Sequence, residues 1–132
     1  MQVAIFNHLL AIFLGGQFLV FGLNGFFNFV KIPAPPKEMA DFLFGLGKAK
    51  YLMTSVKLLE IISGALILWP STRLLGLLLL APVIFNIIGI QVEFNLKKSW
   101  IVLLQVLLPY LLLLGLGFSR LLAVLGEVLQ LA

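Results

Sequence analysis

The sequence predicts an all-α integral membrane protein: a single domain over residues 1–132, folded as an antiparallel bundle of four transmembrane helices. Of its 132 residues, 62% are hydrophobic and only 11% are charged, about half the charged share of a soluble domain. A soluble domain this small needs many more polar residues to cover its surface. A disordered chain would instead be poor in apolar residues. Because a transmembrane helix takes about 20 apolar residues, the apolar content supplies about four.

The first apolar run covers residues 3–30 and contains no Lys, Arg, Asp or Glu, so it can cross a bilayer with some tilt. Three prolines between positions 33 and 36 end it, because proline cannot continue a helix. Over residues 36–46, apolar side chains recur at positions 39, 42, 43 and 46, with charges on the other side. This spacing predicts a short amphipathic helix, which lies at the membrane interface or folds back over the bundle.

Three further spans are expected at residues 51–69, 74–92 and 100–118, followed by an amphipathic extension at residues 120–131. The connection at residues 70–73 is tight, so the second and third spans should be antiparallel neighbours. Pro82 and Pro109 lie inside the third and fourth spans. Each removes one backbone hydrogen bond, which allows a kink and frees a carbonyl.

The basic residues predict the orientation. The first and third loops hold six lysines, whereas the N-terminus, the second loop and the tail hold only Arg73 and Arg120. Excess lysine marks cytoplasmic loops. The loops at 31–50 and 93–99 are therefore predicted to be cytoplasmic, with both termini outside.

Composition also excludes several function classes. The net charge is +4, but the basic residues are scattered and form no patch with interleaved aromatics, so nucleic-acid binding is not expected. The chain has no cysteine, which excludes disulfides and Cys-ligated metals. Its single histidine, His8, has no nearby acid or second histidine, so no metal site is predicted. No nucleotide or hydrolase motif occurs.

Each span places a polar residue in the same half of the bilayer. Counted from the side of the first and third loops, the helical rise puts these residues about 7–13 Å deep. Glu60 lies deepest, and Asn28 continues the polar stripe of Asn24 on the first span. Polar groups at this depth usually face the bundle interior. The sequence thus predicts a one-sided polar chamber, with the 36–46 helix as its lid, formed by Asn24, Asn28, Lys57, Glu60, Asn86 and Gln105.

Four of these residues have a structural alternative. Lys57 can extend to the interface, or it can pair with Glu60, its i+3 neighbour on the same helix face. Glu60 must be protonated or paired at this depth, and it is either one half of that ion pair or a group that contacts a ligand or exchanges a proton. Asn24 and Asn86 can instead form hydrogen bonds between helices.

Three segments carry a family resemblance: 21–27 (FGLNGFF) before the proline-rich loop, 58–64 (LLEIISG) and 80–87 (LAPVIFNI). In this order and spacing they resemble the DoxX family of small membrane proteins, over about residues 10–118. The resemblance implies a four-helix bundle, usually in the bacterial inner membrane, with a link to thiosulfate:quinone oxidoreductase subunits. The recurring residues of that family map onto Asn24, Glu60, Pro82 and Asn86. The chain departs from the pattern at Gly25 and Gln91, where many members carry Lys and His.

Three functions follow as hypotheses. The first is a small binding or accessory protein that holds a lipid or quinone in the chamber, or docks another membrane subunit or a second copy. The second is a subunit of a quinone-linked oxidoreductase, whose cofactor a partner would carry. The third is a proton-coupled transporter that uses Glu60. No resident cofactor, catalytic residue or metal ligand is predicted, and the expected partner is membrane lipid.

Overall fold

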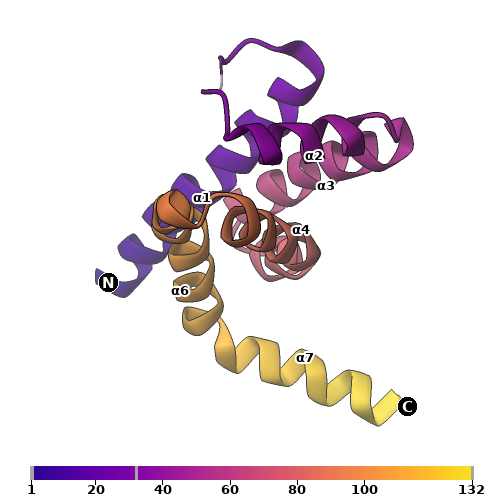
Figure 1. Cartoon of the computed structure of the whole chain (residues 1–132). Helices are drawn as coiled ribbons and strands as arrows, with labels where there is room; N and C mark the ends of the chain where they lie inside the picture. Colours follow the sequence, from indigo (N-terminus) through magenta and orange to yellow (C-terminus); the bar gives the residue numbers. More distant parts are fainter. Residues whose placement is uncertain (1, 32, 132) are drawn as a thin grey trace.

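The computed structural model describes residues 2–31 and 33–131, and within them every regular element is helical (Figure 1). The first half of the chain forms α1 (Gln2–Phe27), α2 (Lys37–Gly47), α3 (Lys50–Leu68) and α4 (Arg73–Phe94). The second half forms the 3₁₀ turn η1 (Leu96–Lys98), α5 (Ser99–Val102), the π-helical turn η2 (Leu103–Leu107), α6 (Leu108–Leu116) and α7 (Phe118–Leu131).

Four helical segments are long and apolar enough to cross a membrane: Ala4–Phe27, Lys50–Leu68, Arg73–Phe94 and Leu96–Leu116. Large apolar side chains cover the outside of the bundle, with Phe85 78% exposed and Leu9 60% exposed. A soluble protein rarely exposes such a continuous apolar surface, whereas lipid tails solvate it. The predicted all-α fold with four membrane-spanning helices is confirmed.

Glycines bring α1 and α3 into backbone contact. A Cβ atom added to Gly64 would lie 2.7 Å from the carbonyl oxygen of Gly15, and one added to Gly15 would lie 2.8 Å from that of Gly64. Two helical turns further along α1, a Cβ atom added to Gly22 would lie 2.6 Å from Cγ1 of Ile61. Small residues at these positions allow helices to approach closely in a membrane, where van der Waals contact drives their association.

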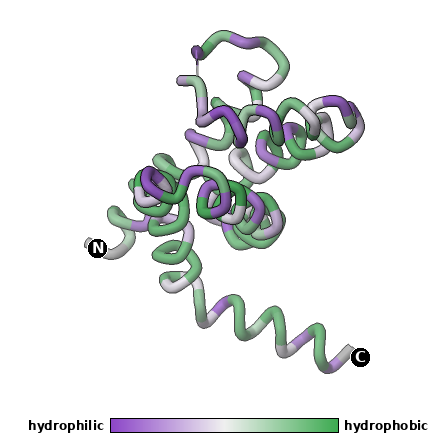
Figure 2. The backbone as a smooth tube through the Cα atoms, viewed as in Figure 1, coloured by the Kyte–Doolittle hydropathy of each residue, from purple (hydrophilic) through white to green (hydrophobic). Residues whose placement is uncertain are grey.

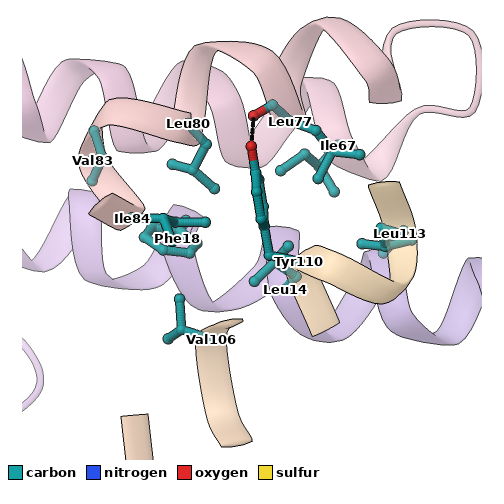
Figure 3. Packing of buried hydrophobic residues seen from close by; sticks show 11 residues of the cluster. Leu14, Phe18, Ile67, Leu77, Leu80, Val83, Ile84, Val106, Tyr110 and Leu113 are labelled. Atoms are coloured by element: carbon teal, nitrogen blue, oxygen red, sulfur yellow. Dashed lines mark hydrogen bonds between the residues drawn. The ribbon is translucent and has the colours of Figure 1, made fainter. Parts of the chain in front are cut away.

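The apolar core joins α1, α3, α4 and α6 (Figure 3). Leu14, Ile67 and Leu80 are fully buried in it. The Tyr110 side chain crosses this core, and its hydroxyl donates a 2.7 Å hydrogen bond to the carbonyl oxygen of Leu77. The one polar group of this buried side chain is therefore satisfied. The core therefore fixes α6 against α4.

The first span ends earlier than the sequence predicts. The helix α1 stops at Phe27, and Asn28 adopts a left-handed conformation with φ of 51°, which asparagine tolerates better than most residues at the end of a helix. The backbone N–H of Asn28 donates to the Asn24 carbonyl at 2.9 Å. The helix is thus terminated by its own cap, before the prolines are reached.

The two intramembrane prolines behave differently. The helix α4 continues through Pro82, whereas the π-helical turn η2 lies just before Pro109. In a regular helix the carbonyl of Gln105 would accept from the N–H of residue 109, which proline lacks. Here the Gln17 side chain donates to that carbonyl at 3.0 Å, so an α1 residue satisfies the group that the proline leaves free.

The two amphipathic helices lie in different places. The helix α2 packs on α3 and α4, with Met39 buried and the ring of Phe42 stacked on Phe94 at 5.1 Å. The helix α7 instead extends away from the bundle (Figure 1), and hydrophilic residues recur along its mostly hydrophobic length (Figure 2). Arg120, in its first turn, donates to the carbonyl of Ser71 at 3.3 Å.

Candidate functional site

A pocket of about 450 Å³ opens between α2, α3 and α4. Phe42, Leu43 and Leu46 of α2 line one side, so the amphipathic helix covers the pocket as expected of a lid. Apolar side chains from α3 and α4 make up most of the remaining wall. Its polar lining residues are Lys57, Glu60 and Asn86. The pocket thus combines a large apolar volume with a small polar patch, the usual composition of a small-molecule site.

Glu60 is the most enclosed of these polar residues, with 5% of its surface exposed. It follows the start of α3 at Lys50 by ten positions, a distance of about 15 Å along the helix axis. A carboxylate at this depth needs a partner, and the Lys57 Nζ lies 3.3 Å from its Oε2. The two form an ion pair at the wall of the pocket.

Lys57 owes its position to a glycine on the neighbouring helix. A Cβ atom on Gly25 would lie 2.6 Å from Cδ of Lys57 and 2.8 Å from its Cγ. The alkyl chain of Lys57 therefore runs over the bare backbone of α1, while its amino group reaches Glu60. Of the two structural alternatives for this lysine, the structure shows the ion pair.

Asn86 stands on the α4 wall of the pocket and is exposed. Its Nδ2 donates to the carbonyl of Pro82, one turn earlier, at 2.8 Å. Because this bond uses the amide nitrogen, the amide oxygen stays accessible as an acceptor. Pro82 itself lines the same pocket.

The other predicted chamber residues do not line this pocket. Asn24 is buried, but its amide is consumed locally: Oδ1 accepts from the Val30 N–H at 2.7 Å and Nδ2 donates to the Val30 carbonyl at 3.0 Å. Asn28 is exposed at the end of α1. Gln105 is joined to Gln17, with its Nε2 2.7 Å from Oε1 of Gln17. The pocket thus contains fewer of the polar residues than the predicted chamber, because Asn24 and Gln105 are hydrogen-bonded elsewhere.

Sequence reasoning missed most of the pocket wall. Met53, Val56 and Ile87 line it, yet in sequence they are indistinguishable from core residues or from residues that face lipid. A signal for α2 was present, since its apolar stripe at positions 42, 43 and 46 is the part that lines the pocket. The Gln17 partnership with Gln105 had one signal, the carbonyl that Pro109 frees four positions earlier.

No family model matches the chain, and no curated protein or solved structure matches it either. The chemistry of the pocket is therefore described from its own residues. Glu60 supplies a hydrogen-bond acceptor, Lys57 a cationic donor and Asn86 an amide oxygen. Among the described residues, no group of three or more His, Cys, Asp or Glu side chains could hold a metal ion. This arrangement is suited to binding a molecule with a small polar group and an apolar body.

Proposed function

We propose that this chain is a small integral membrane protein that binds an amphipathic molecule, a lipid or a quinone, in the pocket between α2, α3 and α4. The observation that carries the proposal is the Lys57–Glu60 ion pair in the wall of an otherwise apolar pocket of about 450 Å³. A buried pair alone often contributes little to stability. We propose that the ion pair serves instead to bind the polar group of a ligand.

The pocket also suggests how such a ligand is oriented. Its polar group would lie at Glu60, Lys57 and Asn86, and its apolar chain would lie along Met53 and Val56. A quinone carbonyl accepts from the Lys57 ammonium, and a lipid hydroxyl donates to the Glu60 carboxylate. The helix α2 is the shortest of the three that line the pocket. We expect it to move to admit the ligand, which requires the stacked rings of Phe42 and Phe94 to separate.

Membership of the DoxX family, a location in the bacterial inner membrane and an accessory role beside another membrane subunit are part of the same proposal. The segments 21–27, 58–64 and 80–87 support the family assignment. The lysines of the loops at 31–50 and 93–99 support a cytoplasmic position for the pocket side. A reporter fused to the C-terminus should be active only outside the cytoplasm, and cytoplasmic activity would contradict this orientation.

The central experiment purifies the full chain in mild detergent and identifies co-purifying lipids and quinones by mass spectrometry. Leu43→Trp fills the pocket from α2, where Leu43 is half-buried. Phe44→Trp is its matched control, because Phe44 is 72% exposed and does not line the pocket. We expect the ligand to be lost from the first variant and kept by the second, with both still folded.

Glu60→Gln separates the alternative functions. It keeps the size of the side chain but removes the charge that Lys57 pairs with. A bound quinone that is lost in this variant, together with a redox partner that co-purifies, favours the oxidoreductase subunit. Solute uptake that is lost in this variant favours the proton-coupled transporter. If ligand content is the same in Glu60→Gln, Leu43→Trp and the unaltered chain, the proposed binding function is wrong.

A further inference from the structure

A second cavity, of about 180 Å³, lies at the end of the bundle away from α2. It is partly open and is bordered by the beginning of α1, the turn before α4, and the junction of α6 and α7. Pro70 and Gly117, which line it, mark the ends of membrane-spanning helices. The cavity therefore lies at the level of the membrane interface, where phospholipid headgroups are found.

The wall of this cavity is cationic. Arg73 and Arg120 supply the positive charge, His8 lies beside them, and none of the lining residues is acidic. Arg73 is only 8% exposed. Its Nε donates to the Ile67 carbonyl at 2.8 Å, and its Nη2 lies 3.4 Å from Nδ1 of His8. Arg73 is thus a buried cation whose hydrogen-bond partners carry no negative charge, an arrangement that an anion would stabilise.

A polar atom in the same wall points to an occupant. The amide oxygen of Asn7 is buried and has no hydrogen-bond partner within the part of the chain that the structure describes. Asn7 lines the cavity beside His8. A buried acceptor without a donor is unfavourable, and a turn of the Asn7 side chain toward the cavity lets a hydroxyl group of an occupant donate to it. The occupant that fits this cavity is therefore an oxyanion with a hydroxyl close to it.

We propose that this cavity binds the headgroup of an anionic phospholipid that carries a free hydroxyl, of the phosphatidylglycerol type. The phosphate diester accepts from the guanidinium groups of Arg73 and Arg120, the side chains best suited to phosphate. The headgroup hydroxyl donates to the Asn7 amide oxygen once that side chain has turned toward the cavity. The acyl chains lie against the apolar surface of the bundle, and α7 extends from the same site with its apolar face available to the lipid.

The test adds phosphatidylglycerol or phosphatidylcholine to the purified full chain and counts retained lipids by native mass spectrometry. Phosphatidylcholine has the same phosphate but no hydroxyl, and its quaternary ammonium is repelled by the arginines. We expect phosphatidylglycerol to be retained in preference. The variant Arg120→Gln should reduce its retention about tenfold, the effect of losing one charged hydrogen bond. Lys98→Gln removes one charge at the other end of the bundle and should have no effect.

A second pair of measurements guards against a folding defect and identifies the source of the phosphate. Arg73→Lys keeps the charge but loses the forked geometry, so phosphatidylglycerol should raise the thermal unfolding temperature of this variant less than that of the unaltered chain, each compared with its own value without lipid. Inorganic phosphate should not raise the unfolding temperature, whereas phosphatidylglycerol should. Equal retention by Arg120→Gln and Lys98→Gln, or equal retention of the two lipids, would overturn the proposal. Stabilisation by phosphate alone would overturn its lipid part.

Discussion

Gln17 of α1 and Gln105 of the π-helical turn η2 hold each other by two hydrogen bonds. Gln17 Nε2 donates to the Gln105 carbonyl at 3.0 Å, and Gln105 Nε2 donates to Gln17 Oε1 at 2.7 Å. The accepting carbonyl is the one that Pro109 leaves without its helical donor. One side chain of the first span therefore compensates for a proline in the fourth.

This pair makes a prediction about stability. Gln17→Leu removes both bonds and should lower the free energy of unfolding by about 1–2 kcal/mol, within the range for hydrogen bonds between membrane helices. In a Pro109→Ala background the cost should be smaller, because residue 109 then supplies an N–H to the carbonyl. Thermal or denaturant unfolding in detergent measures both values. An equal cost in the two backgrounds would show that the proline is not what makes the bond necessary.

The contact of α1 with α3 makes a second prediction. Gly64→Ala places a Cβ 2.7 Å from the Gly15 oxygen and 2.8 Å from the Leu19 nitrogen. Both are backbone atoms that cannot rotate away, so the variant should lose about 1–3 kcal/mol of stability. Gly89→Ala is the control, since no atom lies within 4 Å of its added Cβ, and it should gain up to about 1 kcal/mol of helix propensity. If Gly64→Ala left the stability unchanged, α1 and α3 could separate enough to accept the added Cβ without cost.

The Asn24 amide makes a third prediction, which concerns local order. Asn24→Leu removes the acceptor of the Val30 N–H, so hydrogen exchange at Val30 should accelerate about tenfold, as expected for the loss of one hydrogen bond. Asn28→Gly is the comparison, because glycine adopts the φ of 51° without strain. Exchange at Val30 should not change in that variant. Unchanged exchange in Asn24→Leu would show that the Asn24 amide does not protect the Val30 N–H.

The Lys57–Glu60 pair makes a fourth prediction. Lys57→Met leaves a buried carboxylate unpaired, which should destabilise the protein by about 1–3 kcal/mol. The double variant Lys57→Met with Glu60→Leu should recover most of that loss, because removal of both charges also removes the cost of burying them. The exposed Lys98, changed to Met, serves as the control. If the stability losses of Lys57→Met and Glu60→Leu, each measured alone, simply add in the double variant, Lys57 and Glu60 are not coupled.

The spans could be predicted from the sequence because they depend on length and composition alone. A run of apolar residues such as 74–92 has to cross the membrane, whatever it contacts. The ion pair of Lys57 with Glu60 was also accessible, since it needs only the i, i+3 spacing on one helix. The apolar stripe of α2 predicted that this helix buries one face, although not which helices it packs on. These features are local, so no knowledge of the tertiary packing was needed.

The partners of the amides could not be predicted in the same way. The depth of Asn24 and Gln105 in the bilayer was read from the sequence, but depth does not say which group an amide will bond. Asn24 bonds to Val30 because the chain turns back at Asn28. Gln105 bonds to Gln17 because α1 and η2 are brought together by the packing of the bundle. Hydrogen-bond partners that depend on a turn of the chain or on helix packing become visible only in three dimensions.

The glycine contact between Gly15 and Gly64 has a mechanical consequence. Because their backbones are in contact, α1 and α3 are expected to move as one unit, which holds the α3 wall of the pocket in place. The α2 wall is held less firmly, because α2 is a short helix attached by a few side chains, among them the stacked ring of Phe42. We therefore expect a guest molecule to be admitted by a movement of α2 rather than of α3.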